Sequence, residues 1–380
     1  MDEKNKRSGL SRRQFLKDVV LGGAAVGASL TMVPGLRLAN AAKKGVYTMK
    51  YDCYLGPTTE ATQVDNWFLD EIVKRSDGRI QIKKFWSGSL HKVGHHLPAV
   101  RDGLSEISLI SYGYYPAAVP LSRGLEWYYR GCNNADSLLY VCRDIYNTTP
   151  ELKSEWEDRN NAKVLFFSNW GYCPFLMKEP LPDVAALKGK KIRGYGLGAD
   201  TVDRLGGRGM PVPAPEVYTA LDRGILDGCF SFAFVAAQKM KLHEQASYSV
   251  EGGAGAFAPT TTIMNRNVWR SLPDDLKEVV NKTADDLLNW RFTEMYSKLI
   301  AESVDNMVKA GVKFSTWSEA EIRKATGIVQ PDQTNEWIEK VAKPHNFDGA
   351  AFQKKVDALI QKYSPGKIKN PWEVYKQKYI

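Results

Sequence analysis

The chain has 380 residues, 43% of them hydrophobic, and a formal net charge of +9 from 52 Lys and Arg against 43 Asp and Glu. This length allows two domains with separate cores, and the composition is ordinary for a globular protein. Past the N-terminal region the basic residues form no blocks, so we expect no nucleic-acid partner. A mild positive balance suits a small anionic ligand.

The first 41 residues have the three parts of an export signal. A basic stretch at 4–7 precedes the twin-arginine motif SRRQFLK at 11–17, and a weakly apolar run follows at 19–33. That run contains three glycines and is shorter than the ~20 strongly apolar residues of a membrane span. Small residues at 39–41 then provide a cleavage site.

We therefore expect a twin-arginine signal peptide at 1–41, cleaved near Ala41, that exports the protein through the twin-arginine translocase to the periplasm. An N-terminal anchor that stays attached is the alternative. Residues 1–41 hold seven of the basic and three of the acidic residues, so cleavage lowers the net charge to +5.

Short apolar segments then alternate with helical ones, which indicates an α/β fold. The helical pattern at 62–75 has apolar residues on one face and ends near Asp77-Gly78. The predicted strands are 46–51, 79–85, 106–111 and 163–168.

One internal similarity predicts how these elements are grouped. The stretch at 99–107 resembles the stretch at 220–228: in each, a helix ends at a glycine, and an acidic residue and an apolar strand follow. Gly103 and Gly224 suit the left-handed conformation that ends many helices. We interpret the pair as two lobes of similar build that share a cleft, where open α/β sheets bind ligands. Two unrelated helix-to-strand turns are the alternative.

The C-terminal third contains a long helical pattern at 274–310, which ends at Gly311. A helix of that length would span about 55 Å, so we expect it to cross both lobes. Ser318 and Glu321 form a capping box that predicts a further helix at 319–327.

Five cysteines remain in the mature chain, and an odd number leaves at least one unpaired. The expected compartment permits disulfides, and Cys132 and Cys142 are the closest pair along the chain and the best candidates for a bridge. The sequence leaves open which pair, if any, is bridged. The others are Cys53, Cys173 and Cys229.

Five motifs occur in an order and approximate spacing typical of one protein family. They are WSGSL at 86–90, the Gly103 turn, LKGKKIR at 187–193, VYTALDRGILDG at 217–228, and MNRNVW at 264–269 followed by Leu272-Pro273. In these features, spread over about 46–345, the chain resembles the DctP-type solute receptors of tripartite ATP-independent periplasmic (TRAP) transporters.

The resemblance implies a two-lobed α/β receptor with hinge strands and a long helix spanning both lobes. Such a receptor closes on a small organic acid and delivers it to membrane permease subunits. We expect hinges near 168–169 and 252–259. The expected parts are lobe I at 42–168 plus about 258–290, lobe II at 169–257 plus about 291–345, and a C-terminal extension at 346–380 that packs on the lobes.

The resemblance also implies a role for Arg193, because the matching arginine of the family binds the carboxylate of the ligand. A guanidinium offers a planar set of donors to a carboxylate and stays charged when buried. Many members have a second arginine where this chain has Cys173 or Pro174, which argues against a dicarboxylate. The segment 229–234 lacks the glutamate that helps to hold a cation in the keto-acid-binding branch, which argues against a metal-assisted keto-acid site.

Aromatic residues are frequent at the same positions, and they favour a flat or apolar ligand body. We expect the carboxylate on Arg193 and the remainder on Trp170 and Phe230. At least half of the aromatic residues are expected to fill the core instead. The full set of candidate ligand-binding residues is Arg193, Trp170, Tyr172, Phe230, Phe232, Tyr195, Tyr112 and Asn169.

An exported metal or redox enzyme is the main alternative function. His91, His95 and His96 are its best candidate ligands, but Gly94 and Pro98 interrupt a helix that would align them. The chain has no Gly-x-Ser-x-Gly motif and no phosphate-binding loop. We therefore expect no catalytic residue, metal or cofactor. A ligand-sensing domain for a signalling partner is a third possibility with the same fold.

Overall fold

The computed structural model describes residues 45–126, 129–256 and 259–380. The signal peptide predicted at 1–41 lies outside these residues. In the described ranges, no helix is both long and apolar enough to cross a membrane.

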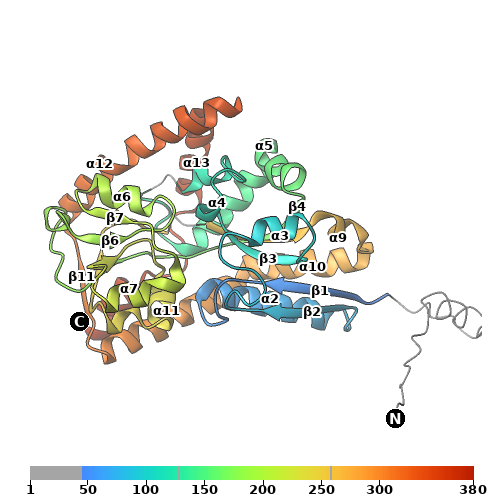
Figure 1. The fold of residues 1–380 in the computed structure, drawn as a ribbon, viewed down its shortest axis with the longest axis horizontal. Helices are drawn as coiled ribbons and strands as arrows, with labels where there is room; N and C mark the ends of the chain where they lie inside the picture. Colours follow the sequence, from blue (N-terminus) through green and yellow to red (C-terminus); the bar gives the residue numbers. More distant parts are fainter. Residues whose placement is uncertain (1–44, 127–128, 257–258) are drawn as a thin grey trace, which may run out of the picture. The chain divides into compact units, whose positions relative to one another are not determined.

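The first of two sheets forms lobe I and has the strand order β2-β1-β3-β10-β4 (Figure 1). β1, β2 and β3 are parallel, and β10 runs antiparallel to both β3 and β4. Its strands are β1 (Tyr47–Asp52), β2 (Ile80–Phe85), β3 (Ile107–Ser111), β4 (Ala162–Asn169) and β10 (Pro259–Asn265). The helices that pack on it are α2 (Glu60–Arg75), α3 (His96–Arg101), α4 (Ala135–Thr148), α9 (Arg266–Ser271) and α10 (Asp274–Asp286), and α5 (Pro150–Ser154) follows α4.

The second sheet forms lobe II and has the order β11-β9-β5-β8-β6-β7. β6 is parallel to β7 and β8, and β5 runs antiparallel to β8 and β9. Its strands are β5 (Phe175–Met177), β6 (Lys191–Arg193), β7 (Arg208–Met210), β8 (Gly228–Cys229), β9 (Tyr248–Glu251) and β11 (Lys313–Thr316). The connecting helices are α6 (Gly198–Arg204), α7 (Val217–Asp222) and α8 (Phe234–Lys239).

The two sheets repeat one topology, as the internal similarity predicts. β2-β1-β3-β10-β4 corresponds strand for strand to β7-β6-β8-β5-β9. Gly103 and Gly224 have φ values of 76° and 71° and follow α3 and α7. The carboxylates of Glu106 and Asp227 each accept a hydrogen bond from a backbone N–H of the parallel neighbour strand, at 2.6 and 2.7 Å. The similarity is therefore a structural repeat.

The chain passes from one sheet to the other between Asn169 and Phe175 and again between Glu251 and Pro259. The hinges predicted near 168–169 and 252–259 fall at the start of the first crossing and within the second, and their role as hinges stays a prediction. As a result, β10 enters the lobe I sheet after lobe II has begun, and β5 enters the lobe II sheet directly from lobe I.

The predicted long helix is present as one continuous run. α10 leads through a π-helical turn at Leu287–Arg291 into α11 (Phe292–Lys309), and Gly311 follows with a φ of 82°. The run packs on α2 of lobe I and on α8 of lobe II, so it spans both lobes.

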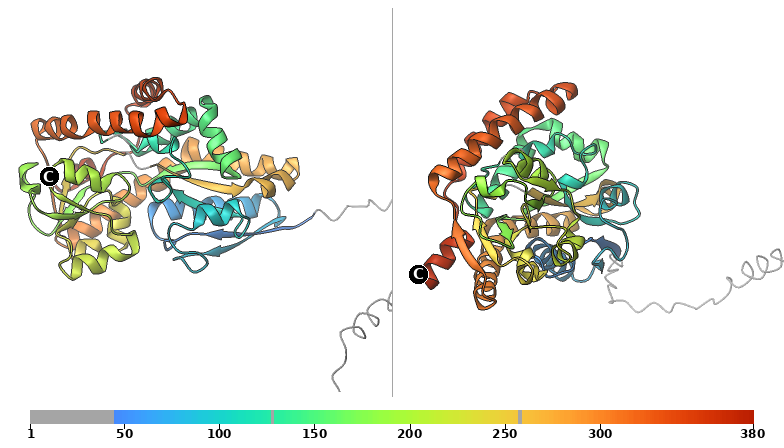
Figure 2. Two further views of the ribbon diagram at one scale, coloured as in Figure 1. Left: turned by 45° about the horizontal axis from the view of Figure 1, so that its top comes forward. Right: turned by 60° about the vertical axis from the view of Figure 1, so that its left-hand side comes forward.

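α12 (Glu319–Trp337) is longer than predicted, because Gly327 does not end it and Pro331 lies inside it. Trp337 explains the extension: it is buried, its Nε1 donates to the carbonyl of Pro120 at 3.1 Å, and a Cβ at Gly124 would lie 2.5 Å from its ring. Both views of Figure 2 show α12 as a long outer helix. α13 (Gly349–Tyr363) then packs on α4, and α14 (Pro371–Tyr379) packs on α11 and β11.

All five cysteines are buried and free, so the bridge considered between Cys132 and Cys142 is not formed. Cys142 faces the core from α4, whereas the carbonyl of Cys132 accepts a hydrogen bond from Ala256 at 2.9 Å in a separate segment. Burial raises the pKa of Cys132 to about 12 and raises that of Cys142 as well.

Candidate ligand-binding site

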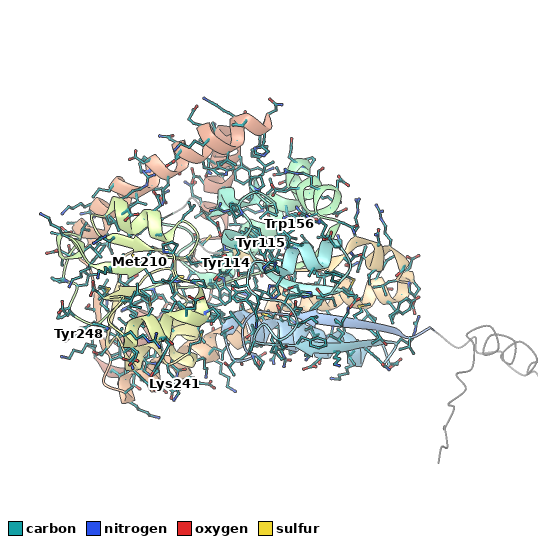
Figure 3. All side chains as sticks on the ribbon, viewed as in Figure 1. Tyr114, Tyr115, Trp156, Met210, Lys241 and Tyr248 are labelled. Atoms are coloured by element: carbon teal, nitrogen blue, oxygen red, sulfur yellow. The ribbon has the colours of Figure 1, made fainter. Side chains whose placement is uncertain are left out.

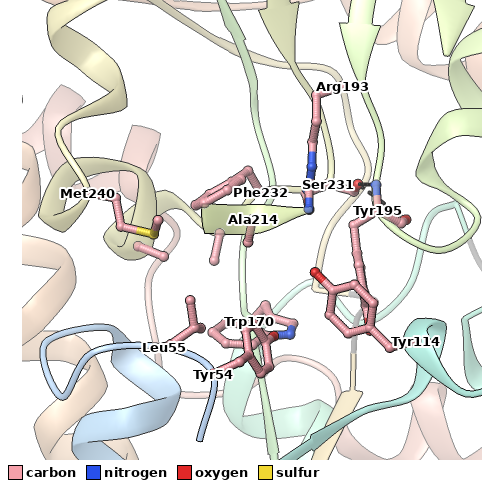
Figure 4. Close-up of a pocket in the computed structure, with 12 residues that line it drawn as sticks. Tyr54, Leu55, Tyr114, Trp170, Arg193, Tyr195, Ala214, Ser231, Phe232 and Met240 are labelled. Carbon is pink, nitrogen blue, oxygen red and sulfur yellow. Dashed lines mark hydrogen bonds between the residues drawn. The ribbon is translucent and has the colours of Figure 1, made fainter. Parts of the chain in front are cut away.

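A small cavity of about 30 Å³ lies between the two lobes (Figure 4). It is formed mainly by aromatic and aliphatic side chains, and its one charged side chain, Arg193, is on the lobe II side. The residues that precede lobe II are Tyr54, Leu55, Tyr114 and Trp170. The residues of lobe II are Arg193, Tyr195, Ala214, Ser231, Phe232, Ala233, Ala236 and Met240.

Arg193 is the only charged residue in this lining, and it is 2% exposed. It ends β6, and its Nε and Nη1 donate to the carbonyls of Val212 and Ser231 at 2.9 and 2.8 Å. The guanidinium also lies over the rings of Phe232 and Tyr195, 5.0 and 5.7 Å from their centroids. Among the residues that the structure describes, no carboxylate forms an ion pair with it. A buried cation without a counter-ion is costly, so this position favours an anionic ligand.

Tyr114 adds a second polar group, and its hydroxyl points toward the Arg193 guanidinium in Figure 4. Within the described ranges, that buried hydroxyl has no hydrogen-bond partner of normal geometry. Burial raises the pKa of Tyr114, and the nearby Arg193 charge opposes the shift. The neutral phenol can therefore donate to a carboxylate that binds Arg193. Tyr114 is labelled near the centre of the molecule in Figure 3.

The two lobes contact each other beside the cavity. The backbone N–H of Gly113 donates to the hydroxyl of Tyr195 at 2.8 Å, and the rings of Tyr114 and Tyr195 are 4.8 Å apart. A Cβ at Gly113 would lie 2.9 Å from the Cα of Gly196, so the two backbones meet. We call Gly113, Tyr195 and Gly196 the interlobe latch, because these residues join the two lobes beside the cavity.

Four of the eight predicted site residues line the cavity: Arg193, Trp170, Tyr195 and Phe232. Trp170 follows β4 and Arg193 ends β6, so each is carried to the cleft at a strand end.

The other four predicted residues pack elsewhere. Phe230 is fully buried and stacks on Phe175 at 4.5 Å, because it faces the lobe II core while Phe232 faces the cleft. Tyr112 is also buried and packs on Trp156 at 5.5 Å in lobe I.

Tyr172 and Asn169 lie in the segment that crosses between the sheets, and their side-chain hydrogen bonds hold this segment in place. The Tyr172 hydroxyl donates to the carbonyls of Asn133 and Ile368, each at 3.2 Å. The Asn169 side chain donates to the carbonyl of Ala135 at 2.8 Å and accepts from the N–H of Gly171 at 2.7 Å.

Sequence reasoning missed several residues of the lining. Tyr54 and Leu55 follow the end of β1, and the strand-end rule that selects Arg193 would have selected them as well. Tyr114 belongs to the aromatic run after β3, but a 3₁₀ turn at Tyr112–Tyr114 decides which ring reaches the cleft. Met240 follows α8 and carries no sequence signal.

Two of the three clustered histidines meet at Asp52. His91 Nδ1 lies 2.7 Å from Asp52 Oδ2, and His96 Nε2 lies 3.6 Å from the same oxygen, while His95 is exposed. Burial lowers the pKa of His96 to about 4. In the part of the chain that the structure describes, no group of three or more His, Cys, Asp or Glu side chains is placed to hold a metal ion.

Comparisons with known proteins agree with this architecture. Residues 56–340 match the family model DctP, described as bacterial extracellular solute-binding protein, family 7. The monocarboxylate 2-oxoacid-binding periplasmic protein all3028 of Nostoc sp. is 28% identical over 68% of this chain and 70% of its own length.

Two solved structures share the fold. A TRAP periplasmic solute-binding protein from Desulfovibrio salexigens, in an open complex, has a TM-score of 0.71 and 25% identity, covering 86% of this chain and 99% of the other. A marine metagenome TRAP solute-binding protein specific for aromatic acid ligands, in complex with metahydroxyphenylacetate, has a TM-score of 0.76 and 22% identity, covering 84% and 99%.

Proposed function

Because the chain belongs to the DctP family of bacterial extracellular solute-binding proteins, we propose that it is the receptor that captures a small organic acid for a TRAP-type transporter. The cleft closes on the acid, and the closed receptor delivers it to the membrane permease subunits. Members of this family are binding proteins of the periplasm and not enzymes, and this chain is a binding protein too.

The observation that carries the proposal is the environment of Arg193. Its guanidinium is buried, is oriented by two backbone carbonyls, and faces a cavity whose lining contains no acidic side chain. Charge-assisted hydrogen bonds from such a group to a carboxylate are among the strongest polar contacts in proteins. One carboxylate, held by Arg193 and Tyr114, satisfies the charge.

The rest of the lining supports an apolar or aromatic ligand body. Trp170, Phe232 and Tyr54 supply ring surfaces, and Arg193 alone supplies positive charge. A second carboxylate would therefore be buried without a partner, which is costly. The structurally similar aromatic-acid receptor supports the same class of ligand.

A 2-oxo monocarboxylate is the second candidate, because the relative from Nostoc sp. binds this class of acid. With no acidic residue in the lining, the keto oxygen would be held by hydroxyl groups, such as that of Tyr114, and not through a cation.

Calorimetry on the mature protein tests both candidates. The panel contains benzoate, phenylacetate, branched monocarboxylates, the 2-oxo analogues of these acids, and a C4-dicarboxylate. We expect the monocarboxylates to bind and the dicarboxylate to bind at least about tenfold more weakly, since its second charge is unpaired. Tight binding of the dicarboxylate with no affinity for any monocarboxylate would contradict the proposal.

We also propose export by the twin-arginine route. Replacing Arg12 and Arg13 together with lysine should keep the precursor in the cytoplasm, because the motif is the address that the translocase reads. Replacing Lys4 and Lys6 with arginine keeps the charge and serves as the control. Fractionation followed by immunoblotting measures the result, and normal export of the double-lysine variant would exclude this route.

A further inference from the structure

A second, larger cavity of about 570 Å³ adjoins the Arg193 cavity. Both cavities are lined by Tyr54, Leu55 and Met240, which therefore separate them. In Figure 4, Met240 and Leu55 lie on the side of the inner cavity away from Arg193. We call the larger space the outer chamber; it lies between the loop at 86–93 of lobe I and the loop at 211–216 of lobe II.

The sizes of the two spaces do not fit a ligand confined to the inner cavity. A volume of about 30 Å³ has room for one or two water-sized groups, enough for a carboxylate and little more. Ligand sites usually occupy roughly 300–1,000 Å³. Of these two spaces, only the outer chamber is within that range. The body of a ligand held by Arg193 therefore has space on the side of the inner cavity where Met240 lies.

The walls of the outer chamber indicate the chemistry of that body. Val93, Pro213 and Pro215 provide apolar surface in addition to the shared residues. Lys92 and Glu216 are the charged members, come from opposite lobes and are exposed at the rim. Their charges have opposite signs, so the chamber offers no net attraction to a second ionised group.

We propose that the ligand is an elongated monocarboxylic acid whose carboxylate binds Arg193 and whose neutral chain passes Met240 into the outer chamber. This inference rests on the proposed function and adds the length and polarity of the substrate. Met240 is then a specificity-determining residue, because its side chain lies where the chain must leave the inner cavity.

A homologous series of straight-chain acids, from propionate to octanoate, tests the proposal by calorimetry on the mature protein. Affinity should rise with chain length by up to about fourfold per methylene, the equivalent of about 0.8 kcal/mol for each methylene that becomes buried. The dicarboxylate of the same length as octanoate should bind more weakly, because Lys92 and Glu216 together offer its second charge no net attraction.

Two variants locate the effect in the structure. Met240→Trp narrows the passage and should reduce octanoate affinity at least about tenfold, and by a clearly larger factor than it reduces propionate affinity. Val93→Trp fills the outer chamber from lobe I without altering the inner cavity. It too should therefore reduce octanoate affinity more than propionate affinity. The matched control is Met295→Trp, a half-buried methionine on α11 that lines neither cavity.

The possible failures are distinct. Binding of benzoate or 2-oxo acids with no gain for longer chains overturns the elongated ligand and leaves the proposed function in place. Preferential binding of the long dicarboxylate overturns the neutral chain. Equal loss of octanoate and propionate in both Met240→Trp and Val93→Trp also overturns the proposal. If no acid of either panel binds, the proposed function itself fails.

Discussion

Arg193 combines two properties that are seldom found together in a folded protein, full burial and the absence of an acidic partner among the described residues. Two backbone carbonyls hold the guanidinium in one orientation, so little conformational entropy is lost when a ligand arrives. A lysine at the same position would lack this pre-organisation, because an ammonium group cannot form the planar set of hydrogen bonds that a guanidinium forms.

Replacing Arg193 with alanine should therefore remove detectable acid binding, a loss of at least about 100-fold. Arg193→Lys should keep the charge and still weaken binding severely. Calorimetry measures affinity, and circular dichroism checks that the fold survives. Arg208→Ala on the neighbouring strand β7 is the control, because Arg208 is exposed. Unchanged affinity in Arg193→Ala would remove this residue from the site.

Glu60, in the first turn of α2, is a second buried titratable residue. Neither carboxylate oxygen has a hydrogen-bond partner of normal geometry among the described residues, and burial raises the pKa of Glu60 to about 8. An unfolded chain has a glutamate pKa near ~4.3, so the folded state binds the proton more tightly. The stability that protonated Glu60 gives the fold is thus lost progressively as the pH rises from about 4 to about 8, because the unfolded chain ionises first.

Glu60→Gln should therefore raise the melting temperature at pH 8 and change it little at pH 4. The gain in unfolding free energy is at most about 4 kcal/mol at neutral pH. Thermal unfolding followed by circular dichroism measures it. Glu71→Gln on the same helix is the control, since neighbouring Arg75 and Lys74 lower the pKa of Glu71. An equal shift at both pH values would contradict this explanation.

At the scale of elements, the interlobe latch joins the 3₁₀ turn after β3 to the loop after β6. Gly113 does not have a positive φ, so an alanine there is free of backbone strain. Its methyl group would nevertheless meet the Cα of Gly196 and the ring of Tyr195 at 2.9 Å. Backbone atoms cannot move away as a flexible side chain can, so the added methyl group opposes closure and not folding.

Gly113→Ala should leave the melting temperature of the free protein nearly unchanged and weaken acid binding by about tenfold or more, because the closed state is penalised. Calorimetry and small-angle scattering with and without acid measure affinity and compaction. Gly327→Ala on α12 is the control, since a Cβ there meets nothing within 4 Å. Full affinity and full compaction in Gly113→Ala would show that the latch is not part of closure.

The sequence predicts elements well where a pattern is local and poorly where packing decides. The repeated glycine turns and the helical run ending at Gly311 have clear local signals, and both are confirmed. Gly327 has the same signal in α12, but burial of Trp337 in the core outweighs it.

The candidate site shows the same difference between residues with a local sequence signal and residues that tertiary packing places. Strand ends point to Arg193 and Trp170, but nothing in the order of residues says that Phe232 faces the cleft while Phe230 faces the core. The contribution of Met240 depends on where α8 ends relative to lobe I, which only the assembled fold determines.

At the scale of the whole molecule, the five cysteines are distributed over both lobes and all are buried as thiols. Burial raises the pKa of Cys53 and of Cys229 to about 12, so their reactive thiolate forms are scarce at neutral pH. The native mature protein should therefore react slowly with a disulfide reagent such as Ellman's reagent. After unfolding in guanidinium without reductant it should release five equivalents. Three equivalents would mean that one disulfide had formed.

The exchange of β5 and β10 between the sheets has a consequence for how the chain is made. Residues 45–169 contain four of the five strands of lobe I, but the strand between β3 and β4 comes only after most of lobe II has been synthesised. Pairings between such distant segments must wait for long loops to close, and they slow folding. A nascent chain that has just completed β4 therefore exposes two strand edges, and both are covered at once when β10 inserts. Lobe I and lobe II are thus separate in space, yet the lobe I sheet is completed only after most of lobe II has been made.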